Sequence, residues 1–415
     1  GGFCSVNMAA AGIYTMGGAF WEFGQTDWER VKLFVLFGVA EDHDSNPIKM
    51  GIGKLKERGG RMIAINPIRT GYNAVADDWI GITPGTDGLL ILSLIHCLLE
   101  AGKIDLDYLA QWTNAPLLLN EAEGPEKGLF VRNAESQPFV IDRRSGHPAP
   151  WDGKGVEPDL GAEWQGNRTV FRHMVEEYLK PDYAPEAVAG KTGVSAERIR
   201  QLAAEIADVA FNQTVTIEQP WTDFRGERHE RMVGRPISFH AMRGISAHSN
   251  GFQTARALHV LQILLGSVEV PGGFRFKPPY PKPSHSHPTP HSYFMPGRPL
   301  DGPHLGFPHG PEHLALKLDD LSPARIDKGF TWENPLSAHG LMHMVIPNAV
   351  AGDPYPIDTL MLYMANMAWN SSMNTSEVME MLTAKNGNGD YKIPRIIYSD
   401  AYASEMVAYA DLILP

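Results

Sequence analysis

The chain has 415 residues, 43% of them hydrophobic and 20% charged, and its 36 Lys and Arg against 48 Asp and Glu give a net charge of −12. This length allows two or more domains with sizeable cores, while the acidic balance argues against a nucleic-acid-binding or anionic-membrane-binding surface. No stretch reaches about 18 uninterrupted apolar residues, and two cysteines exclude both a disulfide-rich scaffold and an iron–sulfur cluster held by four cysteines of this chain.

Apolar runs separated by Gly, Pro and polar loops predict alternating strands and helices along the chain. Asn46 can cap a helix that Pro47 opens and that Gly59 ends. Residues 120–167 are polar and rich in Gly and Pro, which predicts a surface excursion with short strands. The predicted elements are a helix within 1–30, a strand over 32–38, a helix from 47, a strand over 61–65, helices over 88–101, 170–179 and 195–209, strands over 213–218 and 237–241, a helix over 253–265, a strand over 359–364, a helix over 375–382, and strands over 395–398 and 411–415.

Two segments that begin more than three hundred residues apart, 32–70 and 359–400, share the order strand, polar loop, helix, strand. Such units direct backbone N–H groups and a helix N-terminus toward anionic ligands. Residues 278–311 are dense in Pro, Gly and His and form the expected boundary. The sequence therefore predicts an α/β fold of two doubly wound Rossmann-like lobes, 1–276 and 277–415, related by pseudo-two-fold symmetry around a large or paired nucleotide-type cofactor.

Four acidic or thiol side chains stand at strand ends or helix starts. Cys4 precedes a helix of small residues, where a buried apolar role and a role as a thiolate with a lowered pKa are both open. Asp44, Asp87 and Asp400 can act as helix caps, or they can bind ribose hydroxyls or the N–H edge of guanine. No turn has the G-x-G-x-x-G spacing, which disfavours a simple NAD site. Cys97 lies within an apolar helix, where packing is its expected role.

A third loop of the same kind, residues 243–251, is bracketed by Arg243 and His248. Either side chain can orient an anionic substrate, and His248 can carry a proton; a surface or structural pair is the alternative. Six histidines between His285 and His313 suggest a metal site at first sight. Their irregular spacing among prolines favours a solvated or funnel-lining loop instead.

Several segments together carry a family resemblance that covers essentially the whole chain. They are Gly1-Gly-Phe-Cys4-Ser-Val-Asn-Met-Ala, Asp44-Ser-Asn-Pro47, Asn66-Pro-Ile-Arg-Thr70 with Pro84-Gly-Thr-Asp87, the 243–251 loop with Pro271-Gly-Gly273, and residues 400–415. These segments resemble the molybdenum oxidoreductases of the dimethyl sulfoxide reductase superfamily, which bind two molybdopterin guanine dinucleotides. The resemblance implies a Mo-bis(molybdopterin guanine dinucleotide) cofactor.

The resemblance also implies roles for particular residues. Cys4 takes the position of the protein ligand to molybdenum, and Arg243 and His248 join it as expected catalytic residues. An upstream segment with a [4Fe–4S] cluster and a downstream pterin-binding domain are expected in the full protein, so we expect this chain to be an interior portion of it. The expected cofactor contacts are Gly38, Asp44, Ser45, Asn66, Pro67, Arg69, Gly85, Thr86, Asp87, Gly244, Ser246, Asn366, Asn370, Ser371 and Asp400.

Within the superfamily, three segments most resemble the catalytic subunits of quinone-linked sulfite dehydrogenases: Met8-Ala-Ala-Ala-Gly12, the His43-Asp-Ser-Asn-Pro47 loop and residues 239–251. This resemblance implies oxidation of sulfite to sulfate, with two electrons passing to a ferredoxin-like iron–sulfur subunit and a membrane anchor subunit. It also implies a place at the cytoplasmic face of the inner membrane, with a periplasmic place still open.

Departures from the family patterns keep other interpretations open. Ser5 follows Cys4 where formate dehydrogenases place His, and Ala40 or Glu41 stands where many members have Asn. The alternatives are a polysulfide, thiosulfate or tetrathionate reductase, a formate or nitrate enzyme of the same superfamily, and a metal-free electron-transfer scaffold. A nicotinamide-dependent dehydrogenase is the weakest alternative, because its glycine pattern is missing.

Overall fold

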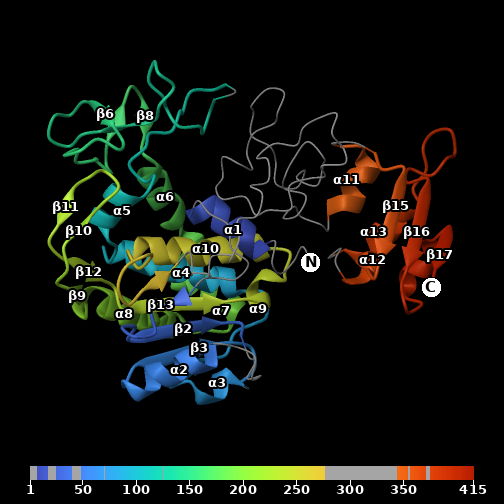
Figure 1. The fold of residues 1–415 in the computed structure, drawn as a ribbon, viewed down its shortest axis with the longest axis horizontal. Coiled ribbons are helices and arrows are strands. Elements are labelled where there is room, and N and C mark those ends of the chain that lie inside the picture. The colour runs from blue at the N-terminus through green and yellow to red at the C-terminus, as the bar shows by residue number, and fades with distance from the viewer. Residues whose placement is uncertain are drawn as a thin grey trace, which may run out of the picture. The chain divides into compact units, whose positions relative to one another are not determined.

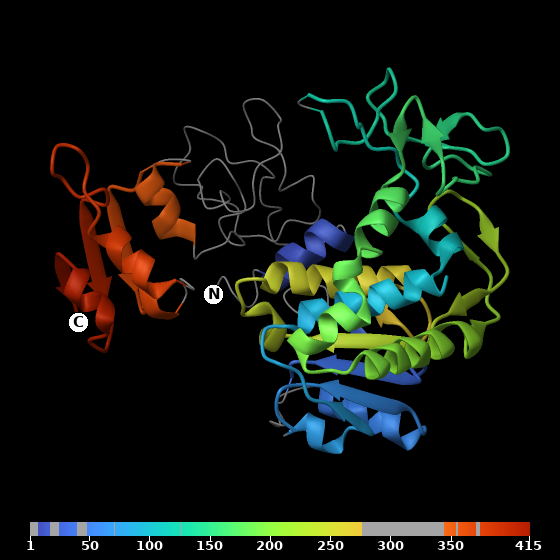
Figure 2. The same cartoon turned by 180° about the vertical axis from the view of Figure 1, so that it is seen from behind.

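The computed structural model describes residues 7–16, 25–39, 48–69, 71–124, 126–275, 344–353, 356–370 and 374–415, with the backbone alone at 9, 10, 13, 14, 243 and 370. The chain forms two compact units. One comprises Gly24–Ala241 and Ala257–Pro278, and the other Gly1–Phe23, Met242–Arg256 and Pro279–Pro415 (Figures 1 and 2). The domain boundary predicted at residue 277 lies outside the described residues.

We call residues 25–241 and 257–275 the first lobe. It is built on a parallel sheet in the order β13–β2–β3–β4 (Figure 1). All five residues of β2 and of β13 are buried, as expected for strands covered on both faces. From β2 the chain proceeds to β3 and β4 on one side and returns to β13 on the other, and doubly wound folds bind ligands where the strand order reverses in this way. The strands are β2 (Leu33–Phe37), β3 (Arg61–Ile65), β4 (Asp78–Ile80) and β13 (Ile237–Ala241).

Helices cover this sheet, and α4 packs against α6, α7 and α8 while α2 and α3 contact β3. An apolar stripe of α8 is buried at Ile199, Leu202 and Ile206, and Ser195 caps this helix by accepting the Arg198 N–H at 3.2 Å. The helices are α2 (Ile48–Glu57), α3 (Tyr72–Val75), α4 (Asp87–Glu100), α5 (Leu106–Trp112), α6 (Val170–Tyr178), α7 (Pro185–Thr192), α8 (Ala196–Asn212) and α10 (Gly251–Leu264), which begins in the other unit.

The predicted surface excursion is confirmed as short strands around a small apolar cluster of Leu118, Phe139, Ile141 and Ala162. The strands are β5 (Phe139–Ile141), β6 (Pro148–Pro150), β7 (Glu163–Trp164) and β8 (Asn167–Arg168), and the remaining short strands of the lobe are β1 (Gln25–Thr26), β9 (Val215–Ile217), β10 (Trp221–Thr222), β11 (Arg228–His229), β12 (Met232–Gly234) and β14 (Phe274–Arg275).

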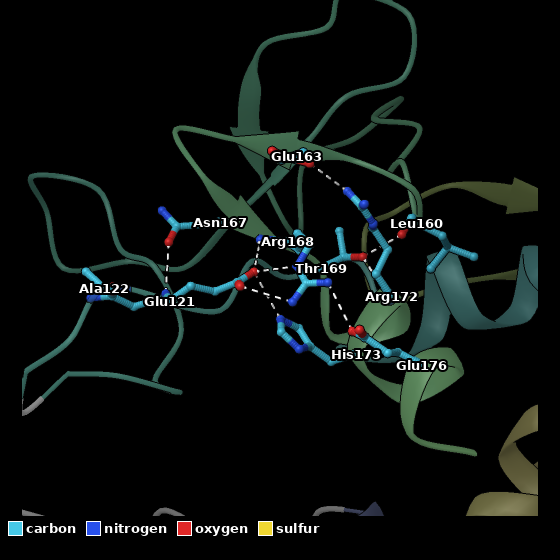
Figure 3. A network of polar contacts seen from close by, with 11 residues as sticks. Glu121, Ala122, Leu160, Glu163, Asn167, Arg168, Thr169, Arg172, His173 and Glu176 are labelled. Atoms are coloured by element: carbon cyan, nitrogen blue, oxygen red, sulfur yellow. Dashed lines mark hydrogen bonds and ion pairs between the residues drawn. The ribbon is translucent and has the colours of Figure 1, made fainter. Parts of the chain in front are cut away.

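Arg168 links the surface excursion, residues 120–167, to α6 by hydrogen bonds (Figure 3). Its Nε donates to Glu121 Oε1 at 2.8 Å and its Nη1 donates to Glu176 Oε2 at 3.0 Å. His173 on α6 also contacts Glu121, at 3.2 Å. The hydrogen bonds from Arg168 lower the pKa of the Glu121 carboxyl to about 2, so this carboxylate is ionised at any physiological pH.

The second lobe, residues 344–415, has a parallel sheet in the order β15–β16–β17. Alternate residues of β15 and β16 are buried, and Leu360, Leu362, Ile396 and Tyr398 form its core with Val378 of α13. The elements are α11 (Val345–Ala351), β15 (Thr359–Tyr363), α12 (Met367–Asn370), α13 (Thr375–Leu382), β16 (Arg395–Ser399), the 3₁₀ helix η8 (Glu405–Tyr409) and β17 (Leu412–Leu414).

The two lobes repeat the same backbone hydrogen bonds at their strand ends. In the first lobe Gly38 donates to Ile65 at 3.0 Å and Asn66 to Ile80 at 3.1 Å; in the second lobe Met364 donates to Ser399 at 2.9 Å and Asp400 to Leu414 at 3.3 Å. The predicted α/β class with two similar parallel lobes is confirmed. The pseudo-two-fold relation between the lobes stays a prediction.

Two predicted loops differ from the structure because each contains one helical turn. The 243–251 loop begins with α9 (Arg243–Ser246), and the loop after β15 contains α12. In α9 the Ser246 hydroxyl donates to the Met242 carbonyl at 3.2 Å, and Asn7 of α1 (Asn7–Met16) donates to the Ser246 carbonyl at 2.8 Å. The hydrogen bond from Asn7 is a tertiary contact, and with the local one to Met242 it stabilises a turn that Gly and Ser disfavour locally. Among the helices described, none is both long and apolar enough to span a bilayer.

Candidate functional site

The predicted cofactor contacts of the first lobe follow the carboxyl ends of its parallel strands, which share one edge of the sheet. Gly38 directly follows β2 and has a φ of 64°, a conformation that glycine adopts without steric cost. Asn66, Pro67 and Arg69 follow the neighbouring strand β3. The strand register pairs Phe37 with Ile65, so Gly38 and Asn66 stand side by side at this edge.

The Asn66 backbone is fixed on both sides. Its N–H donates to the Ile80 carbonyl at 3.1 Å, and its carbonyl accepts the Trp79 indole N–H at 3.1 Å. Only 6% of Asn66 is exposed, whereas Pro67 and Arg69 are exposed. The edge therefore offers, beside the fixed backbone of Asn66, the Arg69 guanidinium that an anionic group can reach.

The loop after β4 contains a turn closed by the Thr86 N–H, which donates to the Thr83 carbonyl at 3.2 Å. Pro84 and Gly85 occupy its central positions, and the φ of 80° at Gly85 is typical of a type II turn. The Thr86 hydroxyl donates back to the Thr83 carbonyl at 2.7 Å, so Thr86 stands at the N-cap of α4 without a side-chain cap hydrogen bond. Asp87 is buried at the first residue of α4, where the helix dipole favours a carboxylate.

The segment after β13, residues 242–256, belongs to the other compact unit. His248 is half-buried, and its Nε2 lies 2.8 Å from the Gly244 carbonyl, so this nitrogen donates a hydrogen bond. Ser246 is buried and bonded to Met242. A Cβ at Gly251 would stand 1.9 Å from the Ser246 carbonyl oxygen, so glycine is required there. His248 and Ser246 thus hold the shape of this loop.

In the second lobe, Asn366 follows β15 and its Nδ2 donates to Glu405 Oε2 at 2.5 Å. Its Oδ1 is buried and has no hydrogen-bond partner within the described chain. A buried acceptor without a donor costs free energy. Asn366 is therefore suited to accept a hydrogen bond from a bound ligand.

Asp400 follows β16, and neighbouring groups fix its carboxylate. The Tyr398 hydroxyl donates to Oδ2 at 2.8 Å and the Tyr402 N–H donates to Oδ1 at 3.3 Å. Tyr398 is only 1% exposed, and its hydroxyl also lies 2.5 Å from Ser404 Oγ. The remaining lone pairs of Asp400 can accept ribose hydroxyls or guanine N–H groups.

These groups fit the dinucleotide that the sequence resemblance implies. Asn366 and Asp400 offer acceptors for its hydroxyl and N–H donors, Gly38 leaves room for a close backbone approach, and Arg69 offers charge to a phosphate. Sequence reasoning missed Tyr398 and Glu405. The signal for Tyr398 was its spacing, since residues two apart on a strand point to the same side.

Several predicted residues fall outside this geometry. Cys4, Asp44, Ser45 and Ser371 lie outside the described residues, as do the side chains of Arg243 and Asn370 and the histidines from His285 to His313. Across the ranges that the structure describes, no three His, Cys, Asp or Glu side chains are grouped to hold a metal ion.

Burial raises the pKa of the Cys97 thiol in α4 to about 11, which keeps it protonated and fits the predicted packing role.

Comparison with known proteins identifies the family. The molybdopterin oxidoreductase family matches residues 3–415. The A subunit of sulfite dehydrogenase from Allochromatium vinosum is 49% identical over 434 aligned residues, which cover 100% of this chain and 44% of that protein. The A subunit of tetrathionate reductase from Archaeoglobus fulgidus is 22% identical, covering 94% of this chain and 34% of that protein.

The formate dehydrogenase major subunit of Haemophilus influenzae is 28% identical over 52% of this chain and 19% of its own length. Among solved structures, acetylene hydratase from Pelobacter acetylenicus gives a TM-score of 0.49 at 15% identity, covering 100% of this chain and 44% of that one. The chain thus spans less than half the length of the curated relatives it matches. With a family match along almost its entire length, the chain belongs to the molybdopterin oxidoreductase family.

Proposed function

We propose that this chain forms two dinucleotide-binding lobes in the catalytic subunit of a molybdenum enzyme that oxidises sulfite to sulfate. The observation that carries the proposal is the 49% identity to the sulfite dehydrogenase relative along the whole chain. The activity belongs to the longer protein, because this chain corresponds to 44% of that relative.

The proposed cofactor is Mo-bis(molybdopterin guanine dinucleotide), which when bound supplies two-electron redox chemistry and oxygen-atom transfer. Cys4 is the proposed protein ligand to the metal. Asn66 and Arg69 would hold one dinucleotide, and Asn366 and Asp400 the other. The support within the chain is the pair of acceptors in the second lobe, Asn366 and Asp400, together with the backbone hydrogen bonds that recur at the strand ends of both lobes.

The sulfur oxyanion would be oriented by the 243–251 loop. Arg243 is the proposed cationic contact because a guanidinium matches an oxyanion with paired N–H donors. His248 already uses Nε2 to donate to Gly244, so it can offer only Nδ1 to a substrate and otherwise keeps the loop in shape. This division of roles refines the sequence prediction that both side chains bind substrate.

Partner subunits and location are part of the same proposal. The sulfite dehydrogenase relative is named as one lettered subunit, which implies further subunits in that enzyme. We propose a ferredoxin-like iron–sulfur subunit and a membrane anchor subunit as partners, a [4Fe–4S] cluster in the N-terminal part of the full-length protein, and a cytoplasmic place at the inner membrane. Co-purification from detergent-solubilised membranes, with iron analysis, tests these points.

A second candidate is a reductase of tetrathionate or another sulfur oxyanion. The tetrathionate reductase relative matches 94% of this chain, although at 22% identity. Turnover of the full-length enzyme with sulfite, thiosulfate, tetrathionate, nitrate and formate separates the candidates. Activity with tetrathionate and none with sulfite would refute the first choice.

The test of the metal site compares Cys4→Ala with the matched variant Cys97→Ala in the full-length protein. We expect Cys4→Ala to lose bound molybdenum and sulfite turnover, while Cys97→Ala keeps both because its thiol is protonated and packed in α4. Wild-type molybdenum content and turnover in Cys4→Ala would refute the ligand assignment. A wild-type protein without molybdenum would favour the metal-free scaffold.

A further inference from the structure

Met364 has an unusual backbone conformation at the carboxyl end of β15. Its φ of 49° lies in the left-handed region, which non-glycine residues seldom adopt because Cβ crowds the backbone. The equivalent position in the first lobe is Gly38, with a φ of 64° and the same backbone hydrogen bond to the neighbouring strand. The first lobe therefore has glycine at the position with this left-handed conformation, whereas the second lobe has methionine there.

Packing within the second lobe does not account for the methionine. Its side chain is 67% exposed, and it is absent from the apolar core formed by the described residues of the lobe. Strained backbone conformations persist mainly where they serve a ligand or a switch. The side chain, rather than the backbone alone, thus needs an explanation.

Met364 stands next to Asp400. Strands β15 and β16 run parallel with Tyr363 opposite Ser399, so the following residues, Met364 and Asp400, adjoin at the same edge about 5 Å apart. The Asp400 carboxylate is oriented by Tyr398 and by the Tyr402 N–H. An exposed thioether side chain therefore lies beside a fixed carboxylate that can accept guanine N–H groups.

We infer that Met364 contacts the guanosine bound at Asp400, with its side chain packed on the face of the guanine ring. This inference rests on the proposed function, which supplies the dinucleotide. Thioether groups pack favourably against aromatic rings, and the strained conformation of Met364 keeps its side chain at the strand edge. In the first lobe Gly38 offers no such surface next to Asn66, so the two lobes hold their nucleotides by different contacts.

The test uses the full-length protein purified without cofactor, with GDP as the probe. Met364→Gly removes the side chain and suits the positive φ, so we expect GDP binding to one of the two lobes to weaken about fivefold while the melting temperature rises by about 2 °C. Met364→Leu keeps an apolar side chain and should bind GDP as the wild type does. A residue with only a structural role would not give opposite effects on stability and binding.

Met364→Asn is a second variant, because Asn tolerates the left-handed region but offers no apolar surface; it should also bind GDP about fivefold more weakly. Met361→Ala is the matched control, since Met361 is 59% exposed on the same strand and should leave GDP binding unchanged. Wild-type GDP affinity in both Met364→Gly and Met364→Asn overturns the inference alone. A wild-type holoenzyme that releases no GMP on acid hydrolysis, and a cofactor-free chain that binds no GDP, overturn the proposed cofactor and the inference together.

Discussion

Asp411 of the second lobe makes the same pair of hydrogen bonds as Asp77 of the first. The Asp77 carboxylate accepts the Met62 N–H at 2.7 Å, and its own N–H donates to the Met62 carbonyl at 2.9 Å. Asp411 does the same with Ile396, at 2.8 Å in both directions. The partners are 15 residues apart in each lobe. This shared detail indicates that the lobes are two versions of one structural unit.

Removing either carboxylate should loosen the strand that it holds. We expect Asp77→Ala and Asp411→Ala each to destabilise its own lobe by about 1 kcal/mol, the usual net value of one hydrogen bond. Amide hydrogen exchange should accelerate roughly fivefold at Met62 in the first variant and at Ile396 in the second. Asp358→Ala is the control, because the Asp358 carboxylate accepts the exposed hydroxyl of its neighbour Thr359. Unchanged protection at both amides would contradict the role of these aspartates.

The Glu121–Arg168 pair should anchor the surface excursion. Glu121 accepts the Arg168 side chain and its backbone N–H, so we expect Glu121→Ala to expose residues 120–167 to limited proteolysis and to lower the melting temperature by about 2 °C. Glu123→Ala is the matched control, since the Glu123 side chain is 86% exposed and pairs with Lys127 on the surface. Equal cleavage of the two variants would show that the excursion is held by other contacts.

The same pair predicts a response to acid. Hydrogen bonds from Arg168 lower the pKa of Glu121 to about 2 from an ordinary 4.5. Because the pKa of Glu121 is lower in the folded chain, the contribution of this pair to stability is complete above pH 4.5. It is lost as the pH falls toward 2. The proteolysis rate of the wild type should therefore approach that of Glu121→Ala only at the acid end of this range.

Two buried histidines should make the first lobe less stable at mildly acidic pH. Burial lowers the pKa of His240 to about 4 and that of His259 to about 3, from an ordinary 6.5. Below pH 6.5 the unfolded chain binds protons that the folded chain does not, so stability falls by about 1.4 kcal/mol per pH unit for each histidine. In urea titrations at pH 7.5, 6 and 5, the free energy of unfolding should fall less steeply with decreasing pH for His259→Gln than for the wild type. The control His147→Gln, at an exposed site, should show the same pH dependence as the wild type. A wild-type pH dependence in His259→Gln would show that His259 does not cause the loss of stability.

The charge of Asp400 should be needed for nucleotide binding. Asp400→Asn keeps the shape of the side chain but replaces one acceptor oxygen with a donor, which would face the N–H groups of guanine. We expect about tenfold weaker GDP binding by the cofactor-free full-length protein, in line with a lost hydrogen bond to a charged group. Asp390→Asn is the control, because Asp390 pairs with Asn388 in a surface turn of the same lobe. Equal GDP affinity in Asp400→Asn would exclude Asp400 from the site.

Most elements of the fold could be predicted because their signals are local. The apolar runs of β3 and β13 and helix α13 have the bounds expected from the sequence. Helix α7 was missed although Pro185 opens it and Gly193, with a φ of 76°, ends it, because its apolar stripe is short and weak. The turn α9 was not predicted, and one of its hydrogen bonds comes from Asn7, more than two hundred residues away in the chain.

The sequence by itself determined the α/β class, the two strand–loop–helix units and the family, because periodicity, turn residues and motif spacing are properties of neighbouring residues. Only the tertiary structure decided that Tyr398 orients Asp400, that Asn366 keeps a buried acceptor without a partner in the described part of its lobe, and that Met364 stands beside Asp400 as Gly38 stands beside Asn66. The pairings of Met364 with Asp400 and of Gly38 with Asn66 arise from strand register. A one-residue slip in register would change both pairings without altering the local pattern.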